Sequence, residues 1–232
     1  GNIPLVGKEK DAVKQFALHI LKDRYGISED DLISAELEIV PAFKARDVGI
    51  DRSMIGAYGQ DDRASAFTLL KAFCGNETPQ HPCLAMFTDK EEIGSEGNTS
   101  VRSNLLQLFL YDVLAGMGMK ADEATIMKAL FNSKALSADV NGAVNPAFQD
   151  VHEKQNACYL GRGVCISKFT GHLGKAGASD ASAEYVGEIR RLFDSAGVIW
   201  QTGEMGKVDE GGGGTVAKFL AAYGMDIIDC GA

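Results

Sequence analysis

The stretch LAMFTDKEEIGS, residues 84–95, places a short apolar run directly before a cluster of charged side chains. The apolar run at 84–87 predicts a short buried strand, because four consecutive apolar residues are typical of strands covered on both faces. Glu91 and Glu92 follow the C-terminal end of this predicted strand. In α/β sheets, ligands bind beyond the C-terminal ends of the strands, so this stretch predicts both an element of the fold and a candidate site.

Helical patterns and further short apolar runs fill the rest of the chain. Helices are predicted at residues 8–25, 63–74, 101–117, 122–132, 180–196 and 215–223. Further strands are predicted at residues 35–41, 164–169 and 198–200 and around 227–228. Helices that alternate with short buried strands indicate an α/β fold, which we expect to be a mixed sheet flanked by helices.

The composition limits the classes of function. The chain has 232 residues, a net charge of -9 and no run rich in Lys or Arg, so we expect no nucleic-acid partner. No apolar run approaches the roughly 20 residues that span a bilayer, so we expect no membrane partner. Five cysteines are scattered without a CxxC pair, which favours a reducing compartment and a cytoplasmic location.

Three acidic positions each allow a structural and a chemical interpretation. Asp61 and Asp62 precede a predicted helix, where an Asp commonly caps the helix; alternatively, one of them bridges two metal ions. Glu91 and Glu92 form either a solvated acidic loop or a metal ligand beside a general base, since adjacent side chains of an extended chain point in opposite directions. Asp139 is either a turn former or a terminal metal ligand.

Residues 211–214 are four glycines before a predicted helix. The spacing of a P-loop is absent, so nucleotide binding is disfavoured. The run is either a flexible surface loop or a segment, including Gly213, whose backbone approaches a substrate closely. Of the four histidines, only His172 lies in a polar segment that could contact substrate. The sequence has neither an HExxH zinc motif nor a GxSxG nucleophile elbow.

The order of the polar segments along the chain is a more specific indication of a protein family than any one segment. They are AYGQDDRASAF (57–67), FTDKEEIGSEGNTS (87–100), LSADVNGAVNP (136–146), GVCISKFTGHLGKAGAS (163–179) and GKVDEGGGGTVAKFL (206–220). This series resembles the aspartyl aminopeptidase family of dinuclear-zinc metallopeptidases, and is most similar to its bacterial branch. The resemblance covers nearly the whole chain, and DKEEIGS is its most distinctive part.

The resemblance implies a role for individual residues. Asp61 matches the aspartate that bridges the two metal ions, and Glu91 matches the general base. Glu92 matches a terminal ligand of one zinc ion, and Asp139 matches the terminal ligand of the other. Lys168 matches a lysine that contacts substrate. The implied reaction is hydrolysis of the first peptide bond of a peptide, with Glu91 taking a proton from water and passing it to the leaving amine.

The resemblance also implies a domain organisation and an assembly. Residues 1–50 are similar to the end of a dimerisation domain, and residues 51–232 to a catalytic domain that is incomplete at its end. Family members build homo-oligomers from dimers, up to dodecamers, so we expect a homo-oligomer that acts on peptide substrates. Two zinc ions per subunit are expected in the complete protein, and Co²⁺ or Mn²⁺ could replace them, because carboxylate-rich sites accept several metals.

The chain departs from the family pattern in its histidines. The family site also uses two histidine ligands, and none of the four histidines here matches them. We therefore expect the segment alone to be inactive and to bind zinc poorly; tight binding of two equivalents in calorimetry would contradict this.

Two alternatives stay open at this stage. The protein could be a non-catalytic subunit that retains the fold and the oligomer contacts, which an assay of N-terminal Asp or Glu peptides with zinc or cobalt would reveal. It could also be another metal-dependent amidohydrolase, such as a deacylase, which would act on N-blocked substrates. An acidic N-terminal preference follows from the resemblance only.

Overall fold

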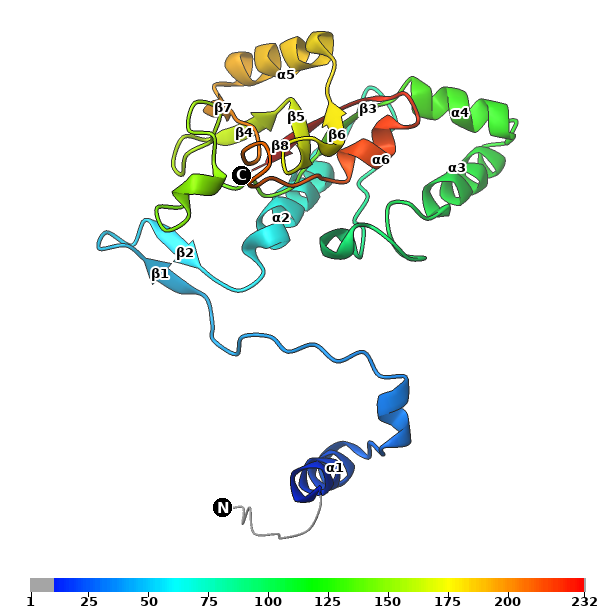
Figure 1. Cartoon of the computed structure of the whole chain (residues 1–232). Helices are drawn as coiled ribbons and strands as arrows, with labels where there is room; N and C mark the ends of the chain where they lie inside the picture. The colour runs from blue at the N-terminus through cyan, green and yellow to red at the C-terminus, as the bar shows by residue number, and fades with distance from the viewer. Residues whose placement is uncertain (1–10, 232) are drawn as a thin grey trace. The chain divides into compact units, whose positions relative to one another are not determined.

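The structure is a computed structural model that describes residues 11–231, and the chain divides into two compact units (Figure 1). The first unit is Gly1–Tyr58 and the second is Gly59–Ala232. The predicted boundary at residue 50 falls in the turn of a β-hairpin, at residues 46–56, and both strands of this hairpin belong to the first unit. The roles assigned to the two predicted domains stay predictions.

The described part of the first unit, residues 11–58, contains two helices and a hairpin. Helix α1 (Ala12–Tyr25) confirms the described part of the helix predicted at 8–25, whose residues 8–10 lie outside the described range. It ends at Gly26, whose positive φ of 72° lets its N–H group cap the last turn. The short helix η1 (Asp30–Ile33) follows, and strands β1 (Arg46–Val48) and β2 (Met54–Gly56) pair antiparallel.

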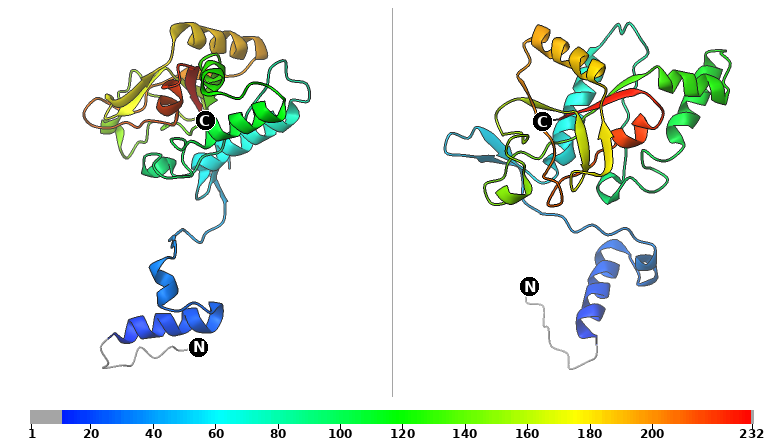
Figure 2. Two further views of the ribbon diagram at one scale, coloured as in Figure 1. Left: turned by 90° about the vertical axis from the view of Figure 1, so that its right-hand side faces the viewer. Right: turned by 45° about the horizontal axis from the view of Figure 1, so that its top comes forward.

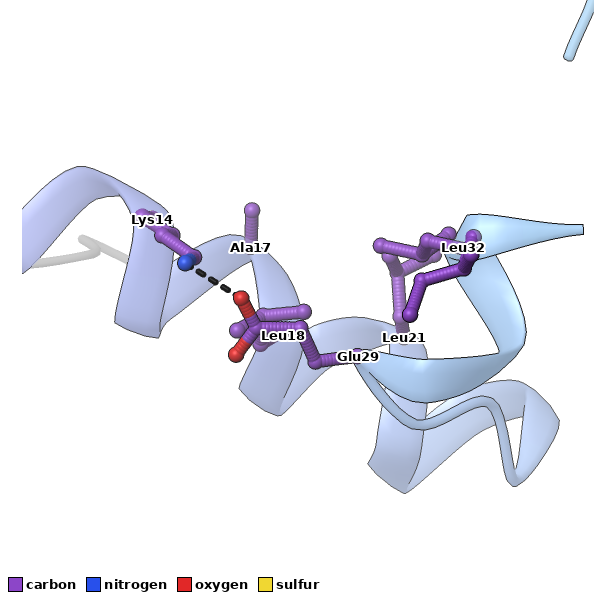
Figure 3. Close-up of a pocket in the computed structure, with 7 residues that line it drawn as sticks. Lys14, Ala17, Leu18, Leu21, Glu29 and Leu32 are labelled. Atoms are coloured by element: carbon purple, nitrogen blue, oxygen red, sulfur yellow. Dashed lines mark ion pairs between the residues drawn. The ribbon is translucent and has the colours of Figure 1, made fainter. Parts of the chain in front are cut away.

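A cavity of about 350 Å³ lies between α1 and η1. Figure 3 shows the residues that line it. Leu18, Leu21 and Leu32 line it, and an ion pair between Lys14 and Glu29 lies at its edge. The lining is mainly aliphatic and holds one carboxylate, so this cavity offers no cluster of groups for chemistry.

The strand predicted at 35–41 is wrong. The structure places these residues in an extended segment without strand pairing, and Ile39 is fully exposed. A strand needs a neighbour to accept and donate its backbone hydrogen bonds. Within the described residues, 11–231, no segment pairs with this one, although its apolar and polar residues alternate as in a strand.

The second unit is built on a four-stranded sheet with the order β3-β8-β4-β7. The strands are β3 (Lys134–Ser137), β8 (Asp226–Gly231), β4 (Val164–Ser167) and β7 (Trp200–Thr202). Strand β8 pairs parallel with β3 and antiparallel with β4, and β4 pairs parallel with β7. The predicted mixed sheet is therefore confirmed.

Helices cover both faces of this sheet (Figures 1 and 2). On one face, α5 (Ala183–Ala196) packs Tyr185 and Ile189 against Ile228 and Ile166. On the other, Ile227 joins a cluster with residues of α3 (Leu105–Gly116), α4 (Glu123–Phe131) and α6 (Ala217–Ala221). Successive side chains of a strand point to opposite faces, which explains why Ile227 and Ile228 belong to different clusters.

The remaining elements surround the sheet. They are α2 (Gln60–Gly75), η2 (Glu91–Ile93), η3 (Gln149–Val151) and the antiparallel strands β5 (Phe169–His172) and β6 (Ala176–Asp180). The strand predicted at 84–87 is absent, and Met86 instead packs against the core from a loop. The single strand predicted at 164–169 is divided into β4 and β5 by Lys168. No helix among the described residues has the length and apolar character needed to cross a bilayer.

Replacing Ser182 with alanine should lower the free energy of unfolding by about 1 kcal/mol, the usual effect of losing a helix N-cap. The Ser182 hydroxyl oxygen accepts a hydrogen bond from the Tyr185 N–H group at 3.3 Å and donates one to Asp226 at 2.9 Å. Urea unfolding measures the effect. Ser195→Ala, at the exposed C-terminal end of the same helix, is the matched control, and equal effects of the two substitutions would contradict the capping role.

Candidate metal centre

Asp61 and Asp62 lie in the first turn of α2, where the backbone departs from helical geometry. Asp61 has φ −83° and ψ 114°, and its peptide bond to Asp62 is cis. Gly59, with a positive φ of 71°, precedes the first residue of α2, and regular helical geometry begins only after Asp62. Ser65, three residues after Asp62, stabilises the charged form of the Asp62 carboxylate, so the capping interpretation stays open for this pair beside the metal-ligand interpretation.

Asp139 follows β3 and is held by the end of β8. A Cβ atom at Gly231 would lie 1.7 Å from the backbone oxygen of Asp139, so only glycine permits this contact. The Val140 N–H group donates to Asp139 Oδ1 at 2.7 Å and fixes the carboxylate. As a result, Asp139 offers a carboxylate oxygen that lies with those of Asp61 and Asp62 in one group, all within 4.8 Å of one another.

Burial and mutual repulsion raise the pKa values of this group. Burial raises the pKa of Asp139 to about 7, and the charges of Glu91, Asp61 and Asp62 add to the increase. Burial also raises the pKa of Asp62, with Asp61 as the second cause. Carboxylates this close cannot all carry their charge without a compensating cation.

A divalent cation fits this group by its donor chemistry. Zn²⁺ accepts carboxylate oxygens, and three protein ligands are typical of its catalytic sites. An oxygen-only set also suits harder cations such as Mn²⁺. The carboxylates of Asp61, Asp62 and Asp139 would hold the ion.

The free energy of unfolding of the metal-free chain should fall as the pH rises from about 4 to about 7. An unfolded Asp titrates near pH 3.9, whereas the pKa of Asp139 in the folded chain is raised to about 7. Between these values the folded state binds more protons than the unfolded state, so its stability is highest below the unfolded pKa and is lost as the pH rises through the folded pKa. Urea unfolding at pH 5 and pH 8 measures this change, and Asp139→Asn should reduce it. An unaltered pH dependence in this variant would rule out the assignment to Asp139.

Glu91 and Glu92 are presented by the turn η2. Lys90 and Gly94 flank it with positive φ values of 65° and 96°, and the Ser95 N–H group donates to the Lys90 carbonyl at 2.8 Å. Glu91 is partly buried, and its pKa is raised first by burial and then by the charges of Glu92, Asp61 and Asp62. A purely solvated loop would not bury this carboxylate, so the structure favours a role for Glu91 beside the aspartates.

A cavity of about 290 Å³ adjoins these carboxylates. The residues that line it are Glu91, Glu92, Gly94, Ser95, His172, Gly214, Thr215, Lys218 and Phe219. Glu92 is exposed and does not belong to the group of ligand atoms that lie within 4.8 Å of one another among residues 11–231. Its predicted role as a metal ligand therefore stays a prediction, while its position in the cavity beside Glu91 is clear.

The three residues predicted to bind substrate differ in position. His172, the exposed last residue of β5, lines the cavity. Lys168 lies between β4 and β5 and forms an ion pair with Asp180. Gly213 is not among the lining residues; its carbonyl accepts a hydrogen bond from the Gly171 N–H group at 3.1 Å.

Sequence reasoning missed three features of the site. Asp62 joins the carboxylate group, and its place beside Asp61 was the available signal. Lys218 lines the cavity, and nothing in its sequence context marks it. Buried Asp229 accepts a hydrogen bond from the Thr215 hydroxyl group, which fixes the end of the glycine run; this contact depends on the pairing of β8 and has no local signal.

The comparisons with known proteins identify the family and the fold. Residues 3–232 match the family described as Aminopeptidase I zinc metalloprotease (M18). The chain belongs to the M18 family. A probable M18 family aminopeptidase 1 from Clostridium acetobutylicum is 49% identical over 232 residues, which are 100% of this chain and 50% of that protein. The chain thus spans about half the length of the curated relatives it matches.

Solved M18 structures confirm the fold class. The crystal structure of an M18 family aminopeptidase from Thermotoga maritima superposes with a TM-score of 0.90 at 49% identity, over 100% of this chain and 51% of that one. The S. cerevisiae mApe1 dodecamer superposes with a TM-score of 0.64 at 22% identity, over 98% of this chain and 49% of that one. The second likeness shows the fold alone.

Proposed function

We propose that the protein is a metal-dependent aminopeptidase that removes the first residue of a peptide. The observation that carries this proposal is that Asp61 and Asp139, far apart in the sequence, offer carboxylate oxygens within 4.8 Å beside the partly buried Glu91. Membership of a family described as zinc metalloprotease supports Zn²⁺ as the ion. An acidic N-terminal preference is part of the proposal and is supported by the resemblance to aspartyl aminopeptidases.

Different carboxylates would bind the metal and transfer the proton. Asp61 and Asp139, with Asp62 close by, would hold the metal, and Glu92 is proposed as a further ligand. Bound Zn²⁺ polarises a carbonyl group and lowers the pKa of water. Glu91 accepts the proton of the attacking water and donates it to the leaving amine, a role for which a carboxylate with a raised pKa is suited. His172 lies in the cavity where the substrate would contact it.

The test is an assay of aminopeptidase activity with the full-length natural protein that contains these residues. With Zn²⁺, it should hydrolyse aminoacyl p-nitroanilides that have a free amine and not their N-acetylated forms. A chelator should abolish the activity, and added Zn²⁺ should restore it. Hydrolysis of the N-acetylated substrates alone would instead indicate a deacylase.

A non-catalytic subunit is the second candidate. The specific observation in its favour is that the carboxylate group found among residues 11–231 contains no histidine. Inactivity of the full-length natural protein with Zn²⁺, Co²⁺ and Mn²⁺, combined with a stable oligomer in sedimentation, would support it. A homo-oligomer is proposed in either case, and the resemblance to a family whose members build homo-oligomers supports this proposal. The scattered cysteines support a cytoplasmic location.

A further inference from the structure

Lys218 is a cation that lines the cavity beside Glu91. It lies in α6, shortly after Gly214 and Thr215, which also line this cavity. Within residues 11–231, no carboxylate oxygen lies within 4.0 Å of its Nζ atom. Nearby lysines differ: Lys168 pairs with Asp180, and Lys175 pairs with Asp209. Lys218 therefore keeps its charge available for a ligand.

The surroundings hold the ammonium group without neutralising it. Its Nζ atom lies 4.8 Å from the centroid of the Phe219 ring. A Cβ atom at Gly177 would lie 3.1 Å from this Nζ atom, and one at Gly214 would lie 3.7 Å away. Gly177 thus leaves space for the ammonium group, Gly214 allows an ordinary contact with it, and the aromatic face stabilises a cation there.

A purely structural role as counter-ion of the carboxylates is the main alternative. Lys218 lines the same cavity as Glu91 and Glu92, yet its Nζ atom forms no ion pair with either of them. A lysine side chain that served mainly to neutralise these carboxylates would contact one of them. The available charge and the cavity beside it fit an external anion better.

We propose that Lys218 binds a carboxylate group of the peptide substrate and selects for substrates that carry one. The inference rests on the proposed aminopeptidase function and adds a residue that determines specificity. The carboxylate could be the side chain of an N-terminal Asp or Glu, or the C-terminus of a very short peptide. The cavity of about 290 Å³ is at the lower limit of ligand pockets, so it suits a single residue.

The test compares Lys218→Met with the unaltered sequence in the full-length natural protein loaded with Zn²⁺. For Asp p-nitroanilide, kcat/KM should fall by about 10- to 100-fold, since a hydrogen bond to a charged group is lost. Values for Asn and Ala p-nitroanilides should stay the same. If the C-terminal carboxylate is the ligand, Ala-Ala should lose activity and Ala-Ala amide should not. Lys218→Arg should retain the preference, and Lys128→Met, on the exposed side of α4, is the control for loss of one positive charge.

Two outcomes would overturn the inference. Equal losses on Asp and Asn substrates would show that Lys218 acts on folding or on the carboxylate cluster, and no loss on any carboxylate-bearing substrate would show that it binds none. Inactivity of the unaltered protein on every substrate would refute the proposed function instead. Calorimetry then still tests the lysine, because L-aspartate should bind more weakly to the Lys218→Met variant and L-asparagine should not.

Discussion

Replacing Glu91 with glutamine should lower kcat by about 10²- to 10⁴-fold, the usual contribution of a general base. Glutamine has nearly the same shape but cannot take a proton from water. Glu91 lies in the cavity, and burial and the charges of Glu92 and Asp61 raise its pKa, which brings the carboxylate closer to the pH at which proton transfer is efficient. Steady-state kinetics on the full-length natural protein with Zn²⁺ measure the effect.

The zinc content of the Glu91→Gln variant distinguishes a general base from a metal ligand. Zinc content, measured by atomic absorption, should be unchanged in Glu91→Gln and reduced in Asp139→Asn. Glu77→Gln, in an exposed loop, is the control for loss of one negative charge and should behave as the unaltered protein. If Glu91→Gln loses zinc in proportion to its loss of activity, Glu91 is a metal ligand, and its proposed role as general base is wrong.

Replacing Ile228 with alanine should lower the free energy of unfolding by about 2–5 kcal/mol, the range for Ile→Ala in a packed core. Ile228 is 1% exposed in the central strand β8 and packs with Ile166, Tyr185 and Ile189. Alanine would lose the transfer free energy of the missing methyl and methylene groups and leave a cavity between the sheet and α5. Urea unfolding at constant pH measures the change.

Ile228→Ala should also disturb the candidate metal centre, because β8 positions residues next to it. Ile228 precedes Asp229, which accepts a hydrogen bond from Thr215, and β8 ends at Gly231 against the backbone of Asp139. Ile228→Val should cost about 1 kcal/mol and leave the site intact. Leu160→Ala, at an exposed position, is the matched control. If Ile228→Ala is no more destabilising than Leu160→Ala, the sheet and α5 are not packed as described.

Local sequence patterns predicted most helices and the class of the fold. The helix at 180–196 is observed as α5 (Ala183–Ala196), because its apolar period, its Ser182 cap and its stop at Gly197 all depend on near neighbours in the chain. The strands were less predictable. Residues 35–41 have a strand pattern but no pairing partner among the described residues. At 84–87, Met86 packs against the core from a loop, while Leu84 and Phe87 are exposed. A strand forms only where another segment supplies hydrogen-bond partners for its backbone. A local sequence pattern does not indicate whether such a segment is present.

The candidate site, too, was predictable in part from the sequence and in part only from the tertiary structure. The sequence by itself determined which groups are available: Asp61, Glu91 and Asp139 are acidic residues in segments typical of the M18 family. Only the tertiary structure decided that Asp61 and Asp139 meet, that Asp62 joins them, and that Lys218 faces the same cavity as Glu91 without an ion-pair partner among the described residues. These contacts depend on strand register and burial, which are set by packing between distant segments and by the glycines that permit it.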